Sequence, residues 1–480
     1  MMGQEGKSIF RAHTILAAIV GLLIVVITLF TILQTAKHKG LWLDEKCEVT
    51  SLCQFSFGHI IVGRTLTQSN KSPLYFLLQK LSLSQIDSFD ANILVSVRSV
   101  SIGAAVLMCL ALFVFIHIHL GLLLAIFIVI SVTSQYLFYN FAAENRPYMT
   151  WILLLALLAV ATLKMCLQSY EKSSLKDRIL FVISVLAITL VISFGVIQSG
   201  MAILTCLFCW YCVHDRPKSL SPLTHFAIPL CLVCILIQGY YTLQGVDAFV
   251  SQIMESQFDL ISQIKRGDGS LLKMPLRLLF PKAPRDIYWG AYLANIFVLL
   301  GMGIPFVWWK KRKILKDKDL FIFVLSIVAL TQVAATFIIA LLIAFLHYWF
   351  VQRLFLYLIV CHALLASTGA YFVLSLNKNI LKPLTKGVLL ILICLSLNWH
   401  WQYYSSFNNP EFTKPCNSMI DDAENNWELI NKEYTYERLD YIVERNQRLE
   451  ACHWARDLQA ERRGFCQSLS GNFLDVDSPF

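Results

Sequence analysis

Residues 14–35 read TILAAIVGLLIVVITLFTILQT, an apolar run that follows a short polar segment containing Lys7 and Arg11. A run of this length spans the hydrocarbon core of a bilayer, which is about 30 Å thick. It is too long for a signal-peptide core, and no small-residue cleavage site follows it. We therefore predict an uncleaved first transmembrane helix.

The composition extends this prediction to the whole chain. The 480 residues are 57% hydrophobic and 15% charged, and the mean hydropathy is +0.62. Such values are typical of a polytopic helical membrane protein and lie outside soluble globular usage. We expect an all-α fold with about eleven transmembrane helices. The further apolar stretches are 92–117, 120–140, 148–168, 179–197, 200–213 (the least secure by length), 224–242, 287–308, 320–346, 351–375 and 386–400.

The charges of the loops predict the orientation. Segments 171–178, 214–218, 310–318 and 378–386 carry the excess of Lys and Arg that cytoplasmic loops prefer. The N-terminus is then cytoplasmic. Loops 36–90, 141–147, 243–286 and 347–350, together with the segment from 401, are extracytoplasmic. We expect a bacterial inner (plasma) membrane, with the active site facing outward. The sequence contains no P-loop motif for ATP. An enzyme on that side should therefore use an activated, lipid-borne donor.

The composition changes at residue 401. Residues 401–480 contain 8 Lys and Arg against 14 Asp and Glu. Apolar residues recur at helical spacing from about Ala423 to Arg463. We expect two parts, a membrane domain over 1–400 that includes the first outer loop 36–90, and a small extracytoplasmic helical tail over 401–480.

The 14 cysteines divide into two groups. Nine lie in apolar stretches and are expected to be small core residues. The others lie in predicted outer segments, where an oxidising compartment permits disulfides; they are Cys47, Cys53, Cys416, Cys452 and Cys466. We prefer the pairs Cys47–Cys53 and Cys452–Cys466, although spacing does not fix connectivity and an odd number leaves one cysteine unpaired.

Two adjacent acids, Asp44 and Glu45, follow the first apolar run in the sequence Leu-Trp-Leu-Asp-Glu. Neighbouring side chains point in different directions, so one can act as a general base while the other organises the loop or a cation. The alternative is that both acids solvate a helix end, and for an isolated pair that interpretation would be favoured. The charged residues of the other predicted outer loops shift the balance towards function.

Lys71 precedes a Ser-Pro turn in the same loop, where a positioned cation suits a phosphate leaving group. The alternative is an interfacial lysine that snorkels to water. Glu144 and Arg146 occupy the short loop 141–147, and such charges are costly there unless paired or functional. Their alternative role is an ion pair that pins a hairpin. Arg353 and Tyr357 lie at the predicted outer end of a late helix, where an arginine facing the bundle is a functional candidate.

These motifs, in this order, resemble the membrane glycosyltransferases of the GT-C superfamily, and most of all the branch that includes protein O-mannosyltransferases and aminoarabinose transferases. The resemblance covers about residues 14–170, with a looser match at Gln352–Tyr357. The matching segments are Leu-Trp-Leu-Asp-Glu at 41–45, Asn-Lys-Ser-Pro-Leu-Tyr-Phe-Leu-Leu at 70–78, Val97–Ser99 at the start of an apolar run, and Glu-Asn-Arg-Pro-Tyr at 144–148.

The resemblance implies an inverting transfer from a polyprenyl-phosphate-linked sugar to a glycan, lipid or protein of the cell envelope. Asp44 matches the first-loop base, Lys71 the residue that holds the donor phosphate, and Glu144 the second-loop acid near the sugar. The implied catalytic residues are Asp44, Glu45 and Glu144. The implied substrate-binding residues are Lys71, Arg146, Tyr148, Arg353 and Tyr357. Membrane lipids are further expected partners, and nucleic acid is not.

The sequence departs from the family pattern in one turn. Lys-Ser-Pro replaces the usual His-Pro-Pro or Lys-Pro-Pro, and Asn70 stands where some relatives have a metal-binding Glu. A divalent metal therefore stays an open question. Two other functions are compatible with a polytopic chain. A lipid-glycan flippase or transporter should place ionisable residues at mid-membrane depth rather than in outer loops. A non-catalytic scaffold subunit of the same fold should bind no donor.

Overall fold

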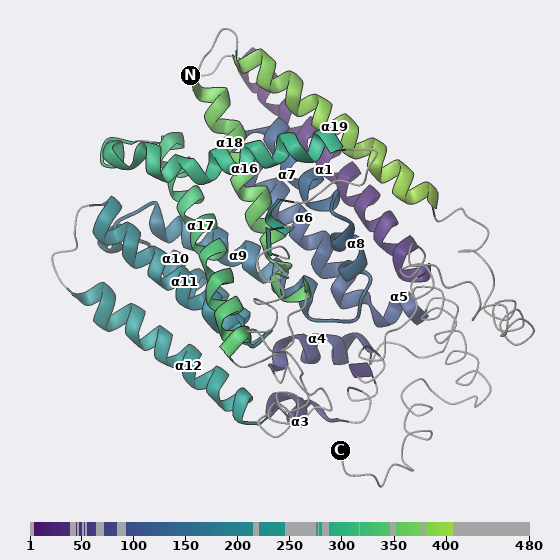
Figure 1. Cartoon of the computed structure of the whole chain (residues 1–480), viewed down its shortest axis with the longest axis vertical. Coiled ribbons are helices and arrows are strands. Elements are labelled where there is room, and N and C mark those ends of the chain that lie inside the picture. The colour runs from purple at the N-terminus through teal and green to yellow at the C-terminus, as the bar shows by residue number, and fades with distance from the viewer. Residues whose placement is uncertain are drawn as a thin grey trace, which may run out of the picture.

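A computed structural model of the chain describes residues 4–38, 45, 48–49, 52, 55–63, 72–83, 93–214, 220–244, 275–276, 278–280, 288–315, 317–345, 352–376 and 381–406. Within these ranges every regular element is a helix, and long helices form one bundle (Figure 1). The all-α prediction is thus confirmed for the described part of the chain.

The chain is an integral membrane protein with several spans. Seven described segments are long and apolar enough to cross a bilayer: Ile15–Lys37, Ser99–Leu120, Tyr148–Cys166, Gly195–Val213, Pro222–Leu243, Lys318–Leu342 and Leu358–Leu376. Leu122–Thr133 and Pro383–Asn398 are shorter apolar helices. The doubtful stretch at 200–213 lies within one of the seven candidate spans, while the full set of about eleven stays a prediction.

The first half of the chain includes α1 (Gln4–His38), α3 (Phe57–Ile61), α4 (Pro73–Leu83), α5 (Ile93–Val97), α6 (Ser99–Leu120), α7 (Leu122–Thr133), α8 (Tyr136–Ala142) and α9 (Tyr148–Cys166). The second half includes α10 (Leu175–Thr189), α11 (Gly195–Phe208), α12 (Ile228–Leu243), α16 (Tyr288–Trp308), α17 (Asp317–Phe345), α18 (Leu358–Leu376) and α19 (Leu381–Ser406). Short helical turns adjoin several of these helices: η1 (Tyr170–Lys172), η2 (Cys209–Val213), η3 (Pro222–Ala227), η4 (Trp309–Lys311) and η5 (Gln352–Phe355).

Three predicted stretches are interrupted inside their apolar sequence. Arg98 separates α5 from α6, with φ −96° and ψ 4°. The extended conformation of Gln135 separates α7 from α8. The predicted boundary between 179–197 and 200–213 is wrong, because α10 ends at Thr189 and α11 already begins at Gly195. A Cβ atom at Gly195 would lie 2.0 Å from the Ile188 carbonyl oxygen, so this tight turn requires glycine.

Hydrogen bonds bring several helix ends together at one end of the bundle. The amide of Leu74 donates to the Leu190 carbonyl over 3.0 Å and ties the start of α4 to the end of α10. The Tyr241 hydroxyl donates to the Ile61 carbonyl over 2.8 Å and ties the end of α12 to α3. Helices α3 and α4 lie across this end of the bundle (Figure 1). We call it the loop-1 end.

The other end of the bundle joins a different set of loops. The His214 ring lies 2.7 Å from the Cys166 carbonyl oxygen, which links the ends of α9 and η2. Arg312 donates to the Cys212 carbonyl over 2.8 Å and adds the end of α16. The two sets of loops agree with the alternation predicted from loop charge, while the compartment that each end faces stays a prediction.

The backbones of helices α16 and α18 approach each other closely. A Cβ atom added to Gly301 would lie 2.1 Å from the Leu365 carbonyl oxygen, and one added to Gly369 would lie 1.9 Å from that of Phe297. Small residues let membrane helices approach in this way, because the backbones themselves make the contact.

The nine cysteines expected in the core are free thiols in the structure: Cys109, Cys166, Cys206, Cys209, Cys212, Cys231, Cys234, Cys361 and Cys394. The core prediction is wrong for Cys394, which is exposed, while Cys212 and Cys231 are partly buried. The two preferred disulfides lie outside the described residues. Helix α19 continues to Ser406, six residues beyond the predicted end of the membrane domain at 400. The helical tail lies outside the described residues from 407 onward, so the division into two parts stays a prediction.

Candidate functional site

The candidate site is formed at the loop-1 end by three segments that are distant in sequence. They are the segment around Glu45 and Glu48 that follows α1, the junction of α5 and α6, and the 143–147 turn between α8 and α9. Each segment contributes at least one buried charged side chain. Because charge is expensive to bury, such a cluster requires internal partners.

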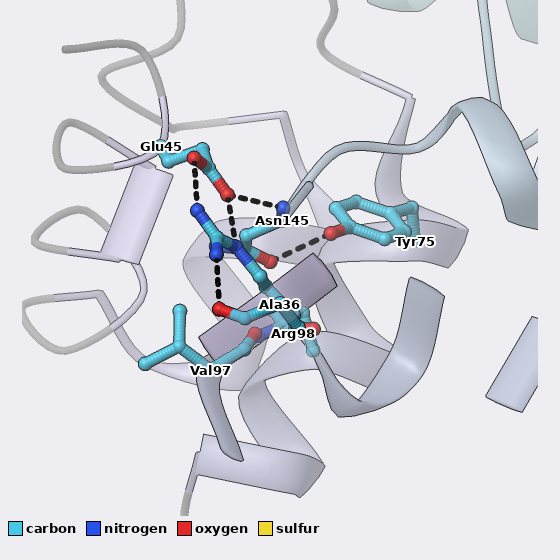
Figure 2. A network of polar contacts seen from close by, with 7 residues as sticks. Ala36, Glu45, Tyr75, Val97, Arg98 and Asn145 are labelled. Atoms are coloured by element: carbon cyan, nitrogen blue, oxygen red, sulfur yellow. Dashed lines mark hydrogen bonds and ion pairs between the residues drawn. The ribbon is translucent and has the colours of Figure 1, made fainter. Parts of the chain in front are cut away.

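Glu45 and Arg98 form a two-pronged ion pair at the centre of the site (Figure 2). Nε of Arg98 donates to Oε1 of Glu45, and Nη2 donates to Oε2, each over 3.0 Å. Both residues are 0% exposed. The planar guanidinium matches both carboxylate oxygens at once, which makes this geometry stronger and more directional than a single contact.

Arg98 also fixes the end of α1. Its Nη1 donates to the Ala36 carbonyl over 2.9 Å. The last carbonyls of a helix lack partners within the helix, and a cation is favourable at that end. Three nitrogen atoms of Arg98 are therefore committed within the protein, so this arginine acts as a structural centre rather than as a ligand-binding group.

Asn145 connects the ion pair to the second loop and to α4. Its backbone N–H donates to Oε1 of Glu45. Its side-chain Oδ1 accepts a hydrogen bond from the Tyr75 hydroxyl over 2.7 Å. Both contacts are visible in Figure 2. Through Asn145, the first loop, the 143–147 turn and α4 share one hydrogen-bonded network.

The environment of Tyr75 keeps its hydroxyl protonated. Burial raises the pKa of Tyr75 well above its usual value, and the negative charge of Glu48 raises that pKa further. A phenol that resists ionisation remains a hydrogen-bond donor. This agrees with its bond to Asn145 and gives the network a fixed direction.

A second ion pair joins the same two loops. Arg146 donates to Glu48 through Nη1, and the side chains of Arg146 and Glu48 are 13% and 3% exposed. The Arg146 carbonyl accepts from the Ser101 hydroxyl over 3.0 Å, which anchors the turn to α6. The hairpin interpretation of Arg146 assumed Glu144 as its partner, whereas the ion pair observed here runs to Glu48 in the first loop.

Two more of the sequence-derived residues lie in or beside the turn. Glu144 is 7% exposed and precedes Asn145 directly. Tyr148 is the first residue of α9, and its ring centroid is 5.8 Å from the guanidinium carbon of Arg146. Glu144, Arg146 and Tyr148 are thus together at the loop-1 end, as their spacing in sequence requires.

Tyr357 lies deeper in the bundle. It is 0% exposed, and its hydroxyl is 2.8 Å from the Thr336 hydroxyl. Its ring packs against Trp151 with centroids 5.3 Å apart, one helical turn below Tyr148. These contacts make Tyr357 part of the protein core below the turn, and its predicted contact with substrate is untested.

Other predicted residues are not placed by the structure. Asp44 and Lys71 lie outside the described residues. For Arg353, the described part is its backbone position in η5. Their roles stay predictions, although Asp44 is covalently next to the well-placed Glu45.

Sequence reasoning gave no role to Glu48, Tyr75 or Asn145, and it quoted Arg98 only as part of a motif. The signal available was an arginine directly before a strongly apolar run, since a charge at that position needs a partner. The partner itself, 53 residues away, has no local signature.

Lys80 makes another contact between α4 and the first loop. It donates to the Leu52 carbonyl over 2.5 Å, and burial lowers the pKa of its ammonium group. This contact further fastens the first loop to α4.

The described residues contain no group of three His, Cys, Asp or Glu side chains that could hold a metal ion. Asp44 and Asn70, the positions on which a metal would depend, lie outside that part of the chain.

Comparison with known proteins gives a likeness in structure only. No protein-family model matches the sequence, and no curated protein matches it significantly. ArnT from Cupriavidus metallidurans in the apo state is similar with a TM-score of 0.50 and 11% identity, over 92% of this chain and 88% of ArnT. The same protein bound to undecaprenyl phosphate gives the same values.

A weaker likeness, to the Archaeoglobus fulgidus oligosaccharyltransferase, has a TM-score of 0.40 and 11% identity and covers 86% of this chain and 56% of that one. That score is too low to support an argument. The likeness to ArnT extends over most of both chains. The chain therefore has a fold similar to that of ArnT.

Proposed function

We propose that this protein is an inverting glycosyltransferase of the cell envelope. It transfers a sugar from a polyprenyl-phosphate-linked donor to a glycan, lipid or protein on the extracytoplasmic face. The observation that carries the proposal is the loop-1 end itself, where acids and arginines from two loops and from the α5–α6 junction meet in a fold similar to that of ArnT. A structure of ArnT contains undecaprenyl phosphate, which supports a lipid donor of this class.

The proposed reaction places opposite charges on the two halves of the donor. The acceptor hydroxyl oxygen bonds to the anomeric carbon while the bond from that carbon to the phosphate oxygen breaks. The sugar ring gains positive charge and the departing polyprenyl phosphate gains negative charge. Carboxylates near the sugar and cations near the phosphate stabilise this transition state.

We assign the roles from this requirement. Asp44 takes the proton of the acceptor hydroxyl, and Glu144 lies near the sugar ring. Lys71 and Arg146 hold the phosphate. The location of Glu144 and Arg146 within one turn at the loop-1 end supports their shared assignment.

The two adjacent acids differ in what they can do. A general base must reach the hydroxyl that it deprotonates. Glu45 is fully buried, and both of its oxygens accept from Arg98. Because the Glu45 carboxylate is buried and already bound by Arg98 and by the Asn145 amide, an acceptor hydroxyl has poor access to it. This supports Asp44 as the base and a supporting part for Glu45.

The location of the site also suits a lipid donor. Its charged residues gather at helix ends rather than along the middle of the described spans. A polyprenyl chain can remain in the bilayer while the phosphate and sugar reach this end. A flippase or transporter, in contrast, would need its ionisable residues near mid-depth. A non-catalytic scaffold would differ by binding no donor.

The test uses the full chain in lipid nanodiscs. Undecaprenyl phosphate binding is measured by native mass spectrometry, and sugar transfer is measured with undecaprenyl-phosphate-linked mannose and related sugars on a cell-envelope fraction. We expect Asp44→Asn to bind undecaprenyl phosphate normally and to lose about 100-fold or more in transfer rate, since general bases contribute on that order. Lys71→Ala should weaken binding of undecaprenyl phosphate.

Lys172→Ala, at an exposed lysine near the opposite end of the bundle, is the matched control and should change neither quantity. Wild-type transfer rates in both Asp44→Asn and Lys71→Ala would refute the assignment. A wild-type chain that binds no undecaprenyl phosphate would favour the scaffold interpretation instead.

A further inference from the structure

We infer that Glu45 and Arg98 are positioning residues that hold the first outer loop against the 143–147 turn and thereby set the place of Asp44. The inference rests on the proposed function, in which Asp44 is the base. Glu45 and Arg98 then contribute to the reaction through Asp44, without touching the substrate.

The first argument is the number of segments that meet at this pair. Arg98 reaches 53 residues back to Glu45 and 62 residues back to the last turn of α1. Glu45 in turn accepts the backbone N–H of Asn145, 100 residues further along. One ion pair thus fixes a helix end, a loop, a helix start and a turn relative to each other (Figure 2).

The second argument is directional precision. The guanidinium fork determines both the distance and the plane of the Glu45 carboxylate. Asp44 and Glu45 are joined by one peptide bond, so their Cα atoms are about 3.8 Å apart, and a displacement of Glu45 also displaces its neighbour. A fixed Glu45 therefore favours a reproducible approach of the proposed base to the acceptor hydroxyl.

The third argument is that the loop is fastened again nearby. Glu48 pairs with Arg146 of the same turn, and Tyr75 of α4 bonds to Asn145. These contacts keep the segment around Glu45 in place even when one bond of the Glu45–Arg98 pair is weakened. A conservative change at the pair should therefore shift the loop slightly without unfolding the site.

The experiment combines two conservative variants with Asp44→Asn in a double-mutant cycle. Glu45→Gln removes the charge and keeps the side-chain size, while Arg98→Lys keeps the charge and removes the fork. We expect each variant to lower the turnover number by about 100-fold, as small misplacements can. The KM for the donor and the binding of undecaprenyl phosphate should stay within about threefold of the wild type, because the loss is confined to the transition state.

The cycle separates positioning from an independent effect. If the pair acts only through Asp44, adding Glu45→Gln or Arg98→Lys to Asp44→Asn should cause no further loss of turnover. Hydrogen exchange provides a readout that is independent of activity. The Asn145 amide should exchange slowly in the wild type and faster in both variants, since its acceptor Glu45 becomes less fixed.

Arg178→Lys is the matched control. Arg178 is also held by internal acceptors, the Ser173 hydroxyl at 2.8 Å and the Tyr170 carbonyl at 2.6 Å. It lies beyond the far end of α9, whose 19 residues extend about 28 Å. The change should leave both turnover and exchange of Asn145 unaltered.

Multiplicative losses in the cycle, or unchanged exchange of Asn145, would overturn the inference while leaving the proposed function intact. If neither variant elutes as monodisperse protein, the inference is also overturned. The pair would then be needed for folding itself. A wild-type chain that binds no donor and transfers no sugar would instead contradict the proposed function.

Discussion

At the scale of single residues, the surroundings of Glu45 define its part in the site. Glu45 is enclosed by Arg98 and the Asn145 amide, and its charge is neutralised inside the protein. This assigns it a role through geometry alone. Asp44, the preceding residue, lies outside the described residues, and its role as the base is a proposal. The pair at 44–45 is thus better understood as one anchor and one proposed reactive group.

Tyr75 offers a residue-scale prediction. Tyr75→Phe removes the bond to Asn145 and should lower stability by about 1–2 kcal/mol near neutral pH, because a buried acceptor loses its donor. Equilibrium unfolding in a denaturing detergent measures the change. Tyr240→Phe is the control, since the Tyr240 hydroxyl is 3.4 Å from the Val62 carbonyl oxygen in an exposed contact.

The pH dependence of that difference follows from the raised pKa of Tyr75. A group with a raised folded-state pKa contributes its stability fully below the unfolded value and loses it as pH rises. The wild type should therefore lose stability relative to Tyr75→Phe once the pH exceeds about 10, where a tyrosine of the unfolded chain ionises. A constant difference from pH 8 to pH 11 would contradict the assigned burial.

The interaction partners of single residues were the hardest feature to predict from the sequence. Glu144, Arg146 and Tyr148 could be grouped because they are nearly consecutive, and the structure keeps them in one turn. The partner of Arg146 could not be foreseen, since Glu48 is 98 residues away and is recognisable only after the helices have packed. The same holds for Arg98, whose apolar surroundings suggested a partner but did not specify it.

At the scale of elements, the apolar runs predicted where helices exist better than where they end. The stretch 120–140 is predicted as one apolar run, yet it divides at the polar residues Ser134 and Gln135 into α7 and α8. Hydropathy indicates only that a segment can enter a membrane. The residue at which a helix ends also depends on how the segment packs against neighbouring helices. The start of α11 at Gly195 likewise depends on its contact with the Ile188 carbonyl.

The crossing of α16 and α18 gives an element-scale prediction. Gly369→Ala places a methyl group where the Phe297 carbonyl lies, so the two helices must separate. We expect destabilisation of about 1–3 kcal/mol or loss of the monodisperse protein, as for overpacking in other cores. Thermal unfolding monitored by size-exclusion chromatography provides the measurement.

Gly200→Ala in α11 is the matched control for this change. A Cβ atom there has no neighbour within 4 Å. Since alanine favours a helix over glycine by about 1 kcal/mol, this variant should be neutral or slightly more stable. Equal destabilisation by both substitutions would show that the α16–α18 contact is not the cause.

At the scale of the whole molecule, the helix ends separate into two sets, and the candidate site belongs to one of them. Loop charge predicts that this set faces outward. Helix α12 is suited to a test of this orientation. Tyr241 near its C-terminal end contacts Ile61, so α12 ends at the loop-1 end. A segment before α12 and a segment after it should therefore lie on opposite sides of the membrane.

Reporter fusions test the orientation directly. We expect a fluorescent protein fused after residue 216 to mature in the cytoplasm, and alkaline phosphatase fused after residue 246 to be active outside it. The exchanged fusions should both be inactive. The reverse pattern would show that the predicted orientation is wrong and that the acids and arginines of the loop-1 end lie on the cytoplasmic side.

The ion pair of Glu45 also constrains how the chain is made. Glu45 leaves the ribosome 53 residues before Arg98 and 100 residues before Asn145. Translation proceeds at about 5–20 residues per second, so Arg98 is synthesised several seconds after Glu45, and Asn145 after about twice that time. During that interval the charge of Glu45 lacks both Arg98 and Asn145 and is best stabilised by water. The network can form only after Arg98 and Asn145 have been synthesised, which makes assembly of this site a late event in biogenesis.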